Sequence, residues 1–370
     1  MVMNWYHTEE GNVNILYIIT GLGLGGAEKV VCDLADQMSA LGHQVKIAYL
    51  VGEVLVRPNS IHIEIVPLGL HSLYDFYSAS KKYRKLIQDF QPDVVHAHMV
   101  HANIFARLSR LFVRVPRLIC TAHSNNEGGR VRMIAYRLTN GLSEVLTNVS
   151  DSACQSFQKQ GAATTNQIQT VYNGIDLERY TFRSQKSLEV DKKNLQFLAV
   201  GRFHEAKDYP NLLHAIAIFR QNPQHKEYIL NVVGDGELRP QIEALIEQLD
   251  LKDNVTVLGR RDDVPQLMQE ADFFILPSAY EGFGLVVAEA MACGVFVIAT
   301  NSGGVAEVMG DTGLLVPPQD SEALAKAIEK AVSKTPLEIQ ENNLKARQRV
   351  EELFSLEASV KKWLALYEAK

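Results

Sequence analysis

Short apolar runs alternate with helical patterns along the first half of the chain. Gly42 ends a helical segment at 27–41, in which apolar residues recur on one face. Five apolar runs have the length and composition of buried strands: 14–20, 44–50, 93–98, 117–122 and 144–149. Strands that alternate with helices predict a parallel, doubly wound sheet.

The pattern breaks between residues 172 and 193 and then restarts. Asn173-Gly174-Ile175-Asp176 is a turn signal, and a polar stretch with few apolar anchors follows it. Helical segments at 209–219 and 240–249 belong to the second cycle. Its expected strands are 195–200, 228–233, 255–258, 272–276 and 295–299.

These patterns predict an α/β protein of two Rossmann-like, doubly wound domains. We expect the first domain at 1–175, a linker at 176–193 and the second domain at 194–350. The amphipathic helix at 351–370 is expected to pack back toward the first domain. Ligands of such folds bind at the carboxyl ends of the strands, so the two domains are expected to face a central cleft.

Composition and charge narrow the class of protein. The 370 residues are 46% hydrophobic and 22% charged, which is typical of a globular protein. The net charge of −6 argues against a dedicated nucleic-acid binder. Residues 1–10 lack the apolar core of a signal peptide and no apolar run reaches bilayer length, so a cytoplasmic protein is expected. Its four cysteines are expected to be buried free thiols: Cys32, Cys120, Cys154 and Cys293.

The strongest chemical signal follows the expected strand at 272–276. Gly282 and Gly284 allow a ligand to approach the backbone, and a helix begins near Gly284. The first N–H groups of a helix have no partner within it, so together with the positive end of the helix dipole they suit a pyrophosphate. Glu289 lies in this helix among apolar neighbours, where a carboxylate must be paired or must bind a ligand such as a ribose diol.

Glu281 and Glu289 have the Glu-x7-Glu spacing of retaining glycosyltransferases with the GT-B fold. The chain resembles the large group of these enzymes called family 4, over nearly its whole length. In overall character it is similar to enzymes that build bacterial lipopolysaccharide, capsule or O-antigen chains. Further motifs agree with the resemblance: Gly25-Gly26-Ala27-Glu28, Asn173-Gly174-Ile175-Asp176, Gly201-Arg202-x4-Lys207, Gly234-Asp235-Gly236-Glu237-Leu238 and Val255-x-Val-Leu-Gly259.

The resemblance implies a role for each of these loops. It implies that Arg202 and Lys207 neutralise the diphosphate of a nucleotide-sugar donor, and fixed positive charge after a strand aids departure of a nucleoside diphosphate. Catalytic roles beside the transferred sugar are implied for His123 and Glu281, and ribose binding for Glu289. The remaining implied contacts are with the diphosphate at Gly25, Gly26, Gly282, Phe283, Gly284 and Leu285, and with the base at Gly259 and Arg260.

Metal and dinucleotide sites are the alternatives to this interpretation. No Asp-x-Asp follows an expected strand, so no metal and no other cofactor is expected, and a helix start explains Asp262-Asp263 more simply. The glycines of Gly21-x-Gly23-x-x-Gly26 match the dinucleotide fingerprint, but the second strand ends without an acid before Glu53. The loop is therefore expected to approach the donor phosphates and the acceptor with its backbone.

Three histidines near strand ends are further candidates. His123 follows the expected strand at 117–122, where it can bond to the transferring sugar. His96 and His98 point the same way along another strand, so zinc is conceivable, but two ligands without a third are weak evidence. We favour His123 for the site; His96, His98 and His101 are near alternatives, and His98 is the first of them.

We expect transfer of a hexose or N-acetylhexosamine from a UDP-sugar to a lipid-linked or core oligosaccharide, with retention of configuration. No enzymic nucleophile stands out, so front-face attack is favoured, in which the leaving phosphate oxygen takes the acceptor proton. A nucleotide-sugar epimerase of the same fold is the alternative, and turnover without an acceptor would reveal it. A binding module without activity is disfavoured because the motif residues are all present: Arg202, Lys207, Glu281 and Glu289.

Positive charge is concentrated in residues 81–137, which hold eleven basic and three acidic residues. Two basic groups stand among apolar residues at helical spacing: Lys81, Lys82, Arg84 and Lys85, and then Arg107, Arg110, Arg114 and Arg117. A basic amphipathic stretch is typical of a helix that lies on anionic lipid, although a solvated helix face has the same pattern. We expect peripheral contact with the inner face of the cytoplasmic membrane.

Overall fold

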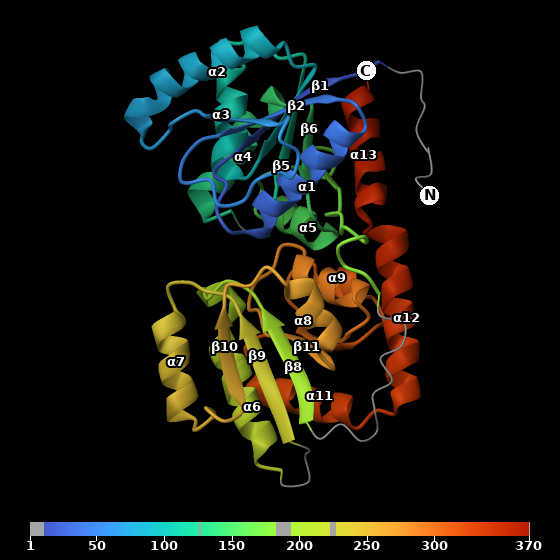
Figure 1. The fold of residues 1–370 in the computed structure, drawn as a ribbon. Coiled ribbons are helices and arrows are strands. Elements are labelled where there is room, and N and C mark those ends of the chain that lie inside the picture. The colour runs from blue at the N-terminus through green and yellow to red at the C-terminus, as the bar shows by residue number, and fades with distance from the viewer. Residues whose placement is uncertain (1–10, 126, 183–193, 223–226, 370) are drawn as a thin grey trace. The chain divides into compact units, whose positions relative to one another are not determined.

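The computed structural model describes residues 11–125, 127–182, 194–222 and 227–369. The chain divides into two compact units (Figure 1). The N-terminal unit contains Met1–Gly174 and Glu357–Lys370, and the C-terminal unit contains Ile175–Leu356. The N-terminal residues 1–10 and most of the expected linker lie outside the described residues.

The N-terminal unit is built on a parallel sheet. Its described strands number seven, in the order β3-β2-β1-β4-β5-β6-β7. These strands are β1 (Asn14–Ile19), β2 (Gln44–Tyr49), β3 (Glu64–Pro67), β4 (Val94–His98), β5 (Arg117–Ala122), β6 (Val145–Asn148) and β7 (Ile168–Thr170). The helices are α1 (Gly26–Ala40), α2 (Phe76–Phe90), α3 (Val100–Ser109), α4 (Arg130–Thr139), α5 (Asp151–Lys159) and α13 (Leu356–Glu368).

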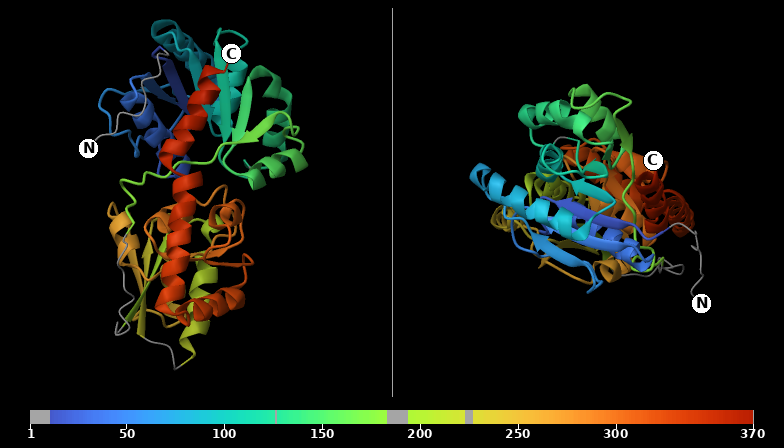
Figure 2. Two further views of the ribbon diagram at one scale, coloured as in Figure 1. Left: turned by 90° about the vertical axis from the view of Figure 1, so that its right-hand side faces the viewer. Right: turned by 90° about the horizontal axis from the view of Figure 1, so that it is seen from above.

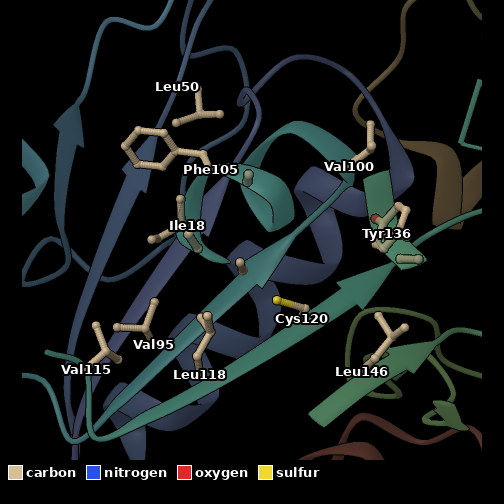
Figure 3. Close-up of a cluster of buried hydrophobic side chains, with 14 of the residues drawn as sticks. Ile18, Leu50, Val95, Val100, Phe105, Val115, Leu118, Cys120, Tyr136 and Leu146 are labelled. Atoms are coloured by element: carbon tan, nitrogen blue, oxygen red, sulfur yellow. The ribbon is translucent and has the colours of Figure 1, made fainter. Parts of the chain in front are cut away.

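The central strands of this sheet are buried along most of their length because helices cover both faces. Figure 3 shows one of the resulting cores, where Ile18, Val95 and Leu118 come from three neighbouring strands. Phe105 of α3 and Tyr136 of α4 close the same cluster. This packing fixes the strands whose carboxyl ends carry the candidate site.

The C-terminal unit repeats the architecture. Its described strands number six, in the order β10-β9-β8-β11-β12-β13, and all of them pair in parallel. These strands are β8 (Asn194–Val200), β9 (Glu227–Val233), β10 (Val255–Gly259), β11 (Phe273–Leu276), β12 (Phe296–Thr300) and β13 (Leu314–Val316). The helices are η3 (Glu205–Lys207, a 3-10 turn), α6 (Tyr209–Arg220), α7 (Arg239–Gln248), α8 (Val264–Glu270), α9 (Leu285–Ala292), α10 (Val305–Met309), α11 (Ser321–Val332) and α12 (Pro336–Leu353).

Each sheet has one point at which the strand order reverses direction. In the N-terminal unit the chain moves outward from β1 to β3 and then returns to place β4 on the other side of β1. In the C-terminal unit it moves outward from β8 to β10 and returns to place β11 beside β8. Doubly wound sheets bind their ligands at such switch points, at the carboxyl ends of the strands. The loops after β1, β4, β8 and β11 are therefore the places to look for chemistry.

The expected fold class is confirmed, and each expected strand has a counterpart in the structure. Three strands were missed, namely β3, β7 and β13, and each lies at a sheet edge. They contain three or four residues and are only partly buried, so they carry too little apolar pattern to be found in the sequence. The four cysteines are buried and free, as expected.

The last helix belongs to the N-terminal unit. Tyr367 of α13 lies 3.1 Å from Tyr17 of β1 (hydroxyl to hydroxyl), and the guanidinium of Arg117 donates to the Leu366 carbonyl at 2.7 Å. Figure 2 shows this end of the chain, in red, beside the strands of the unit. Among the described residues, no helix combines the length and apolar character that crossing a bilayer requires.

Candidate functional site

An ion pair lies at the switch point of the C-terminal unit. Lys207 follows β8, Glu281 follows β11, and their Nζ and Oε1 atoms are 2.5 Å apart. Both side chains are largely shielded, with 23% of the lysine and 12% of the glutamate exposed. The Ser278 hydroxyl also donates to the same carboxylate oxygen at 2.7 Å, so the carboxylate is held from two sides. Adjacent strands thus bring together two residues that are 74 positions apart.

Backbone hydrogen bonds hold the two loops in this arrangement. The amides of Ala279 and Tyr280 both donate to the Ala206 carbonyl, at 2.9 and 3.2 Å. On the other side, the Tyr209 hydroxyl donates to the Gly201 carbonyl at 2.9 Å. Because both loops are tied down, the lysine is placed by the fold and does not depend on a ligand for its position.

The loop after β11 leads directly into α9, as expected. Gly284 is the N-cap residue, with a φ of +89° in the left-handed region and no side-chain cap. A Cβ at this position would stand 3.0 Å from Val305, so a larger residue meets both backbone strain and a close contact. Gly282 is half-buried, Phe283 and Gly284 are buried, and Leu285 opens the helix. The free N–H groups at the start of α9 therefore lie on the same loop as Glu281.

Glu289 is buried within α9, and only 6% of the residue is exposed. It has a partner in the protein, because the Tyr180 hydroxyl shares a side-chain hydrogen bond with it. Burial, and then the charge of Glu289, raise the pKa of Tyr180 above its usual value. Tyr180 thus provides a hydrogen-bond partner for the Glu289 carboxylate in its apolar surroundings. The burial of Glu289 therefore does not by itself require a ribose.

The other expected residues of this unit lie at the same edge of the sheet. Arg202 lies two residues after the end of β8 and is exposed. Gly259 ends β10 with a φ of +68°, and Arg260 follows it. The Arg260 guanidinium is 3.7 Å from the carboxylate of Asp235, which follows β9. The sequence did not single out Asp235 as a partner because that contact depends on the order of the strands.

In the N-terminal unit the glycine loop follows β1 and leads into α1. Gly25 is the N-cap residue and has no side chain to cap the helix, and both Gly25 and Gly26 are exposed. A Cβ on Gly25 would come within 2.3 Å of the Glu28 carboxylate, so a larger residue there would displace that side chain. The exposed backbone of this loop is consistent with the predicted approach to a ligand.

Three imidazoles lie together across β4 and β5 of this unit. The rings of His96 and His98 are 3.9 Å apart, and Nδ1 of His98 lies 3.0 Å from Nε2 of His123. His96 is bonded at both nitrogens, to the Tyr367 hydroxyl and to the Thr121 hydroxyl, each at 2.7 Å. Both nitrogens of His96 thus have protein partners, and no group of three potential ligands among the described residues is arranged to hold a metal ion.

Burial keeps these imidazoles neutral. It lowers the pKa of His123 to about 4, and it holds the pKa values of His96 and His98 well below the usual range, with a smaller effect of neighbouring imidazoles. His96 and His98 are fully buried, whereas His123 is only half-buried. His123 is therefore the member of the cluster that a ligand can reach.

Glu127 is a residue of this region that the sequence did not indicate as functional. Its carboxylate accepts the backbone N–H of His123 at 3.0 Å and that of Val100 at 3.1 Å. Desolvation raises its pKa, and these hydrogen bonds oppose the rise. Glu127 thus ties the loop after β4 to the loop after β5. Met99, which joins β4 to α3, has a left-handed φ of +72°, which is uncommon outside glycine.

The expected basic stripe of residues 107–117 is wrong in part. Arg107 is fully buried, with its guanidinium over the Tyr136 ring and bonded to Thr139. Arg110 is paired with Glu144, and Arg117 donates to backbone carbonyls of α13. Helical spacing does not distinguish an arginine on a solvated face from one that α4 and the sheet cover. Arg114 of the same group is exposed, as are the basic residues of α2: Lys81, Lys82, Arg84 and Lys85.

Comparison with known families accounts for this pair of units. The family described as Glycosyltransferase Family 4 matches residues 24–179, and the family described as Glycosyl transferases group 1 matches residues 181–350. The chain belongs to these glycosyltransferases. The family 4 resemblance seen in the motifs is confirmed, and the enzyme class is that of a transferase.

Similar glycosyltransferases come from several bacteria. The N-acetyl-alpha-D-glucosaminyl L-malate synthase of Bacillus anthracis is 28% identical over 93% of this chain and 94% of its own length. A relative from Campylobacter jejuni is 26% identical over 84% of this chain and 87% of its own length. Its name describes a 4-alpha-N-acetylgalactosaminyltransferase that acts on a diphospho-undecaprenol acceptor.

Solved structures show the same fold. Anabaena HepE in complex with UDP and glucose has a TM-score of 0.81 and 22% identity, over 97% of this chain and all of that one. A sucrose-phosphate synthase from Thermosynechococcus elongatus has a TM-score of 0.83 and 23% identity, over 96% and 98% of the two chains. The fold of this glycosyltransferase is accordingly GT-B.

Proposed function

We propose that this chain is a retaining, metal-independent glycosyltransferase that uses a UDP-sugar. In this proposal it moves a hexose or N-acetylhexosamine to a hydroxyl of a lipid-linked or core oligosaccharide during bacterial surface polysaccharide synthesis. The observation that carries the proposal is the shielded pair of Lys207 and Glu281 at the switch point, with Glu281 on the loop that opens α9. A cation, a carboxylate and free helix N–H groups within one site are what a sugar diphosphate requires.

The pair provides a route to leaving-group stabilisation. Lys207 neutralises charge that grows on the diphosphate as the glycosidic bond breaks, and Arg202, exposed after the same strand, adds a second cation. When the diphosphate binds Lys207, Glu281 keeps its hydrogen bond from Ser278 and can accept hydrogen bonds from the hydroxyls of the sugar. In the front-face mechanism the leaving phosphate oxygen accepts the acceptor proton, and we assign binding of the sugar to His123.

The remaining roles follow the same edge of the C-terminal sheet. Glu289 binds the ribose, with Tyr180 holding its carboxylate in place. We assign base binding to Gly259 and Arg260, and diphosphate binding to Gly25 and Gly26. The UDP complexes of HepE support the choice of a uridine nucleotide.

Two kinds of acceptor are represented among the relatives. The name of the B. anthracis enzyme specifies L-malate, and the name of the C. jejuni enzyme specifies a lipid diphosphate. We favour the lipid-linked class because the N-terminal unit exposes apolar side chains beside basic ones. Leu111 and Phe112 are 61% and 65% exposed after α3, and Arg84 of α2 donates to the Phe112 carbonyl at 2.6 Å.

Helix α4 carries a second exposed apolar group. Val131, Ile134 and Leu138 lie on one face of this helix and are all exposed, and Arg130 and Arg137 flank them. Apolar residues among arginines suit an anionic bilayer surface, where each basic residue contributes about 1 kcal/mol that salt screens. We place the membrane contact on these residues and on the lysines of α2.

Sedimentation with vesicles tests the membrane contact. The protein is expected to bind phosphatidylglycerol-containing vesicles at low salt, and Ile134→Ser with Leu138→Ser is expected to weaken that binding. Leu337→Ser with Leu344→Ser, which replaces two exposed leucines of α12, serves as the matched control. Equal binding to neutral and anionic vesicles at low salt would remove the membrane from the proposal.

A donor and acceptor screen tests the reaction itself. UDP-glucose, UDP-galactose and UDP-N-acetylglucosamine are each incubated with a polyprenyl-diphosphate-linked sugar, with L-malate or with no acceptor. The proposal expects UDP release that depends on the lipid-linked acceptor and a product that keeps the anomeric configuration of the donor. Sugar epimerisation without any acceptor would favour the epimerase alternative.

A further inference from the structure

The contact between His98 and His123 limits which ring nitrogen of His123 can carry a proton. Their facing nitrogens are 3.0 Å apart, and burial keeps both rings neutral. Each neutral imidazole carries one N–H and one bare nitrogen, so a single proton lies between the two rings. Either Nδ1 of His98 donates to His123, or Nε2 of His123 donates to His98.

The second nitrogen of His98 decides between these two arrangements. Its Nε2 atom is buried and has no hydrogen-bond partner among the described residues. A buried N–H without an acceptor is rarer in proteins than a buried acceptor without a donor. His98 therefore carries its proton on Nδ1, where His123 accepts it, and leaves the bare nitrogen on the buried side.

The ring of His98 is not free to turn away from this contact. It stacks on His96 at 3.9 Å and lies 5.8 Å from the Tyr17 ring. His96 is itself fixed at both nitrogens, and Trp363 of α13 packs on it at 4.4 Å. The orientation of His98 is thus determined by β1, β4 and α13 together.

We propose that His98 is a positioning residue that holds His123 as the Nδ1–H tautomer. The half-buried ring of His123 then presents an N–H donor at Nδ1, an atom to which no described residue is bonded in the structure. This inference rests on the proposed function for its ligand, since the acceptor of that N–H is a sugar hydroxyl oxygen of the UDP-sugar. His98 thereby makes the Nδ1 atom of His123 a hydrogen-bond donor to the sugar.

Nitrogen-15 spectra of histidine-labelled protein test the tautomer without any substrate. The proposal expects the wild-type His123 to show a protonated Nδ1 and a bare Nε2. In His98→Phe, which keeps the stacking surface but removes the donor, His123 is expected to shift to the Nε2–H form that free imidazole prefers. In His98→Asn, whose side-chain amide can donate from nearly the same place, the wild-type pattern is expected to return.

Kinetics with the UDP-sugar found active in the donor screen provide the second measurement. Loss of one hydrogen bond to the sugar is expected to lower kcat about tenfold in His98→Phe, with His98→Asn nearer to wild type. Thr147→Val removes the last hydroxyl of the buried chain from His96 through Thr121, so it controls for destabilisation of the same sheet. This control is expected to leave the His123 signals and kcat unchanged.

The outcomes separate this inference from the proposed function. A wild-type His123 protonated at Nε2 overturns the inference, even if no variant folds. An unchanged tautomer in His98→Phe also overturns it. If the tautomer shifts as expected but His123→Ala retains full kcat, the pairing stands and the role of His123 in the proposed function fails.

Discussion

The strand order reverses beside the first strand of each sheet, yet the side chains that follow those strands differ in kind. In the C-terminal unit they are ionic, with Lys207 paired to Glu281 and Arg202 exposed nearby. In the N-terminal unit they are neutral imidazoles, and His123 is the accessible one. One topology therefore carries two chemistries, fixed charge suited to a diphosphate and neutral hydrogen bonding suited to a sugar.

The difference has a physical cause in the surroundings of each site. The partly exposed loops of the C-terminal unit keep a charged pair at low cost because each member neutralises the other. The histidines of the N-terminal unit lie between strands and α13, where a charge would be left without a counter-ion. Conditions that alter charge should therefore affect the two units differently.

Removal of the lysine is expected to have the largest effect. Lys207→Ala should lower kcat by about 100- to 1,000-fold and affect donor affinity less, because charge on the leaving group grows toward the transition state. Arg202→Ala is expected to act in the same direction and more weakly, because the side chain is more exposed. Steady-state kinetics with the active UDP-sugar measure both.

The control for these variants is Lys252→Ala, which removes an exposed lysine paired with Glu247. It is expected to leave kcat unchanged. If Lys207→Ala raised only the KM for the donor, the cation would contribute to donor binding in general and not to departure of the leaving group.

Acid is expected to destabilise the N-terminal unit selectively. The pKa values of His96 and His98 are lowered in the folded state, so the unfolded chain takes up protons first as the pH falls below about 6.5. The two histidines should therefore lower the free energy of unfolding at pH 5 and not at pH 7.5. Trp363 packs on His96, so its fluorescence reports on this unit.

The C-terminal unit serves as the internal control for the effect of acid. Among the described residues of the C-terminal unit no histidine is buried. Hydrogen exchange at pH 7.5 and pH 5 should therefore show faster opening in β4 and β5 than in β8 and β11. Equal acceleration in both units would contradict the account of the buried imidazoles.

The ribose prediction expects a moderate effect. Glu289→Ala should weaken binding of free UDP by about 1–3 kcal/mol, because a charged hydrogen bond to the ribose is lost. Tyr180→Phe keeps the carboxylate and removes the hydroxyl that holds it, so a smaller loss of UDP affinity is expected. Calorimetric titration with UDP measures both. Unchanged affinity in a folded Glu289→Ala protein would assign this residue to structure alone.

A chelator is expected to have the smallest effect of all. If Arg202 and Lys207 supply the positive charge that the leaving group requires, EDTA should leave the activity of the wild-type protein nearly unchanged. Strict dependence on an added divalent ion would overturn the role given to these two cations.

The sequence predicted the parts of this protein that depend on local pattern. Apolar runs marked the central strands, and the glycines of the loop at 282–284 marked the start of α9. The pair of Lys207 and Glu281 was not predicted, because it depends on β8 and β11 being neighbours. Tyr180 was missed as the partner of Glu289 because the contact joins two segments that are far apart in the sequence.

Burial was the property that the sequence predicted least well. The spacing that placed Arg107 on a basic face is the same for an arginine that packs over Tyr136. The cluster of His96, His98 and His123 depends on the pairing of β4 with β5 and on a helix more than 200 residues later in the chain. The sequence pattern of one segment does not show which of its side chains another segment will bury.

Hydrogen exchange of the wild-type protein with and without UDP, in the presence of EDTA, tests the central claim most directly. The account predicts that UDP alone slows exchange in the loops 201–208 and 277–289 of the C-terminal unit. It also predicts that Lys207→Ala weakens this protection and that 117–127 of the N-terminal unit is affected less. Protection confined to the N-terminal unit, or protection that appears only with a divalent ion, would contradict the account.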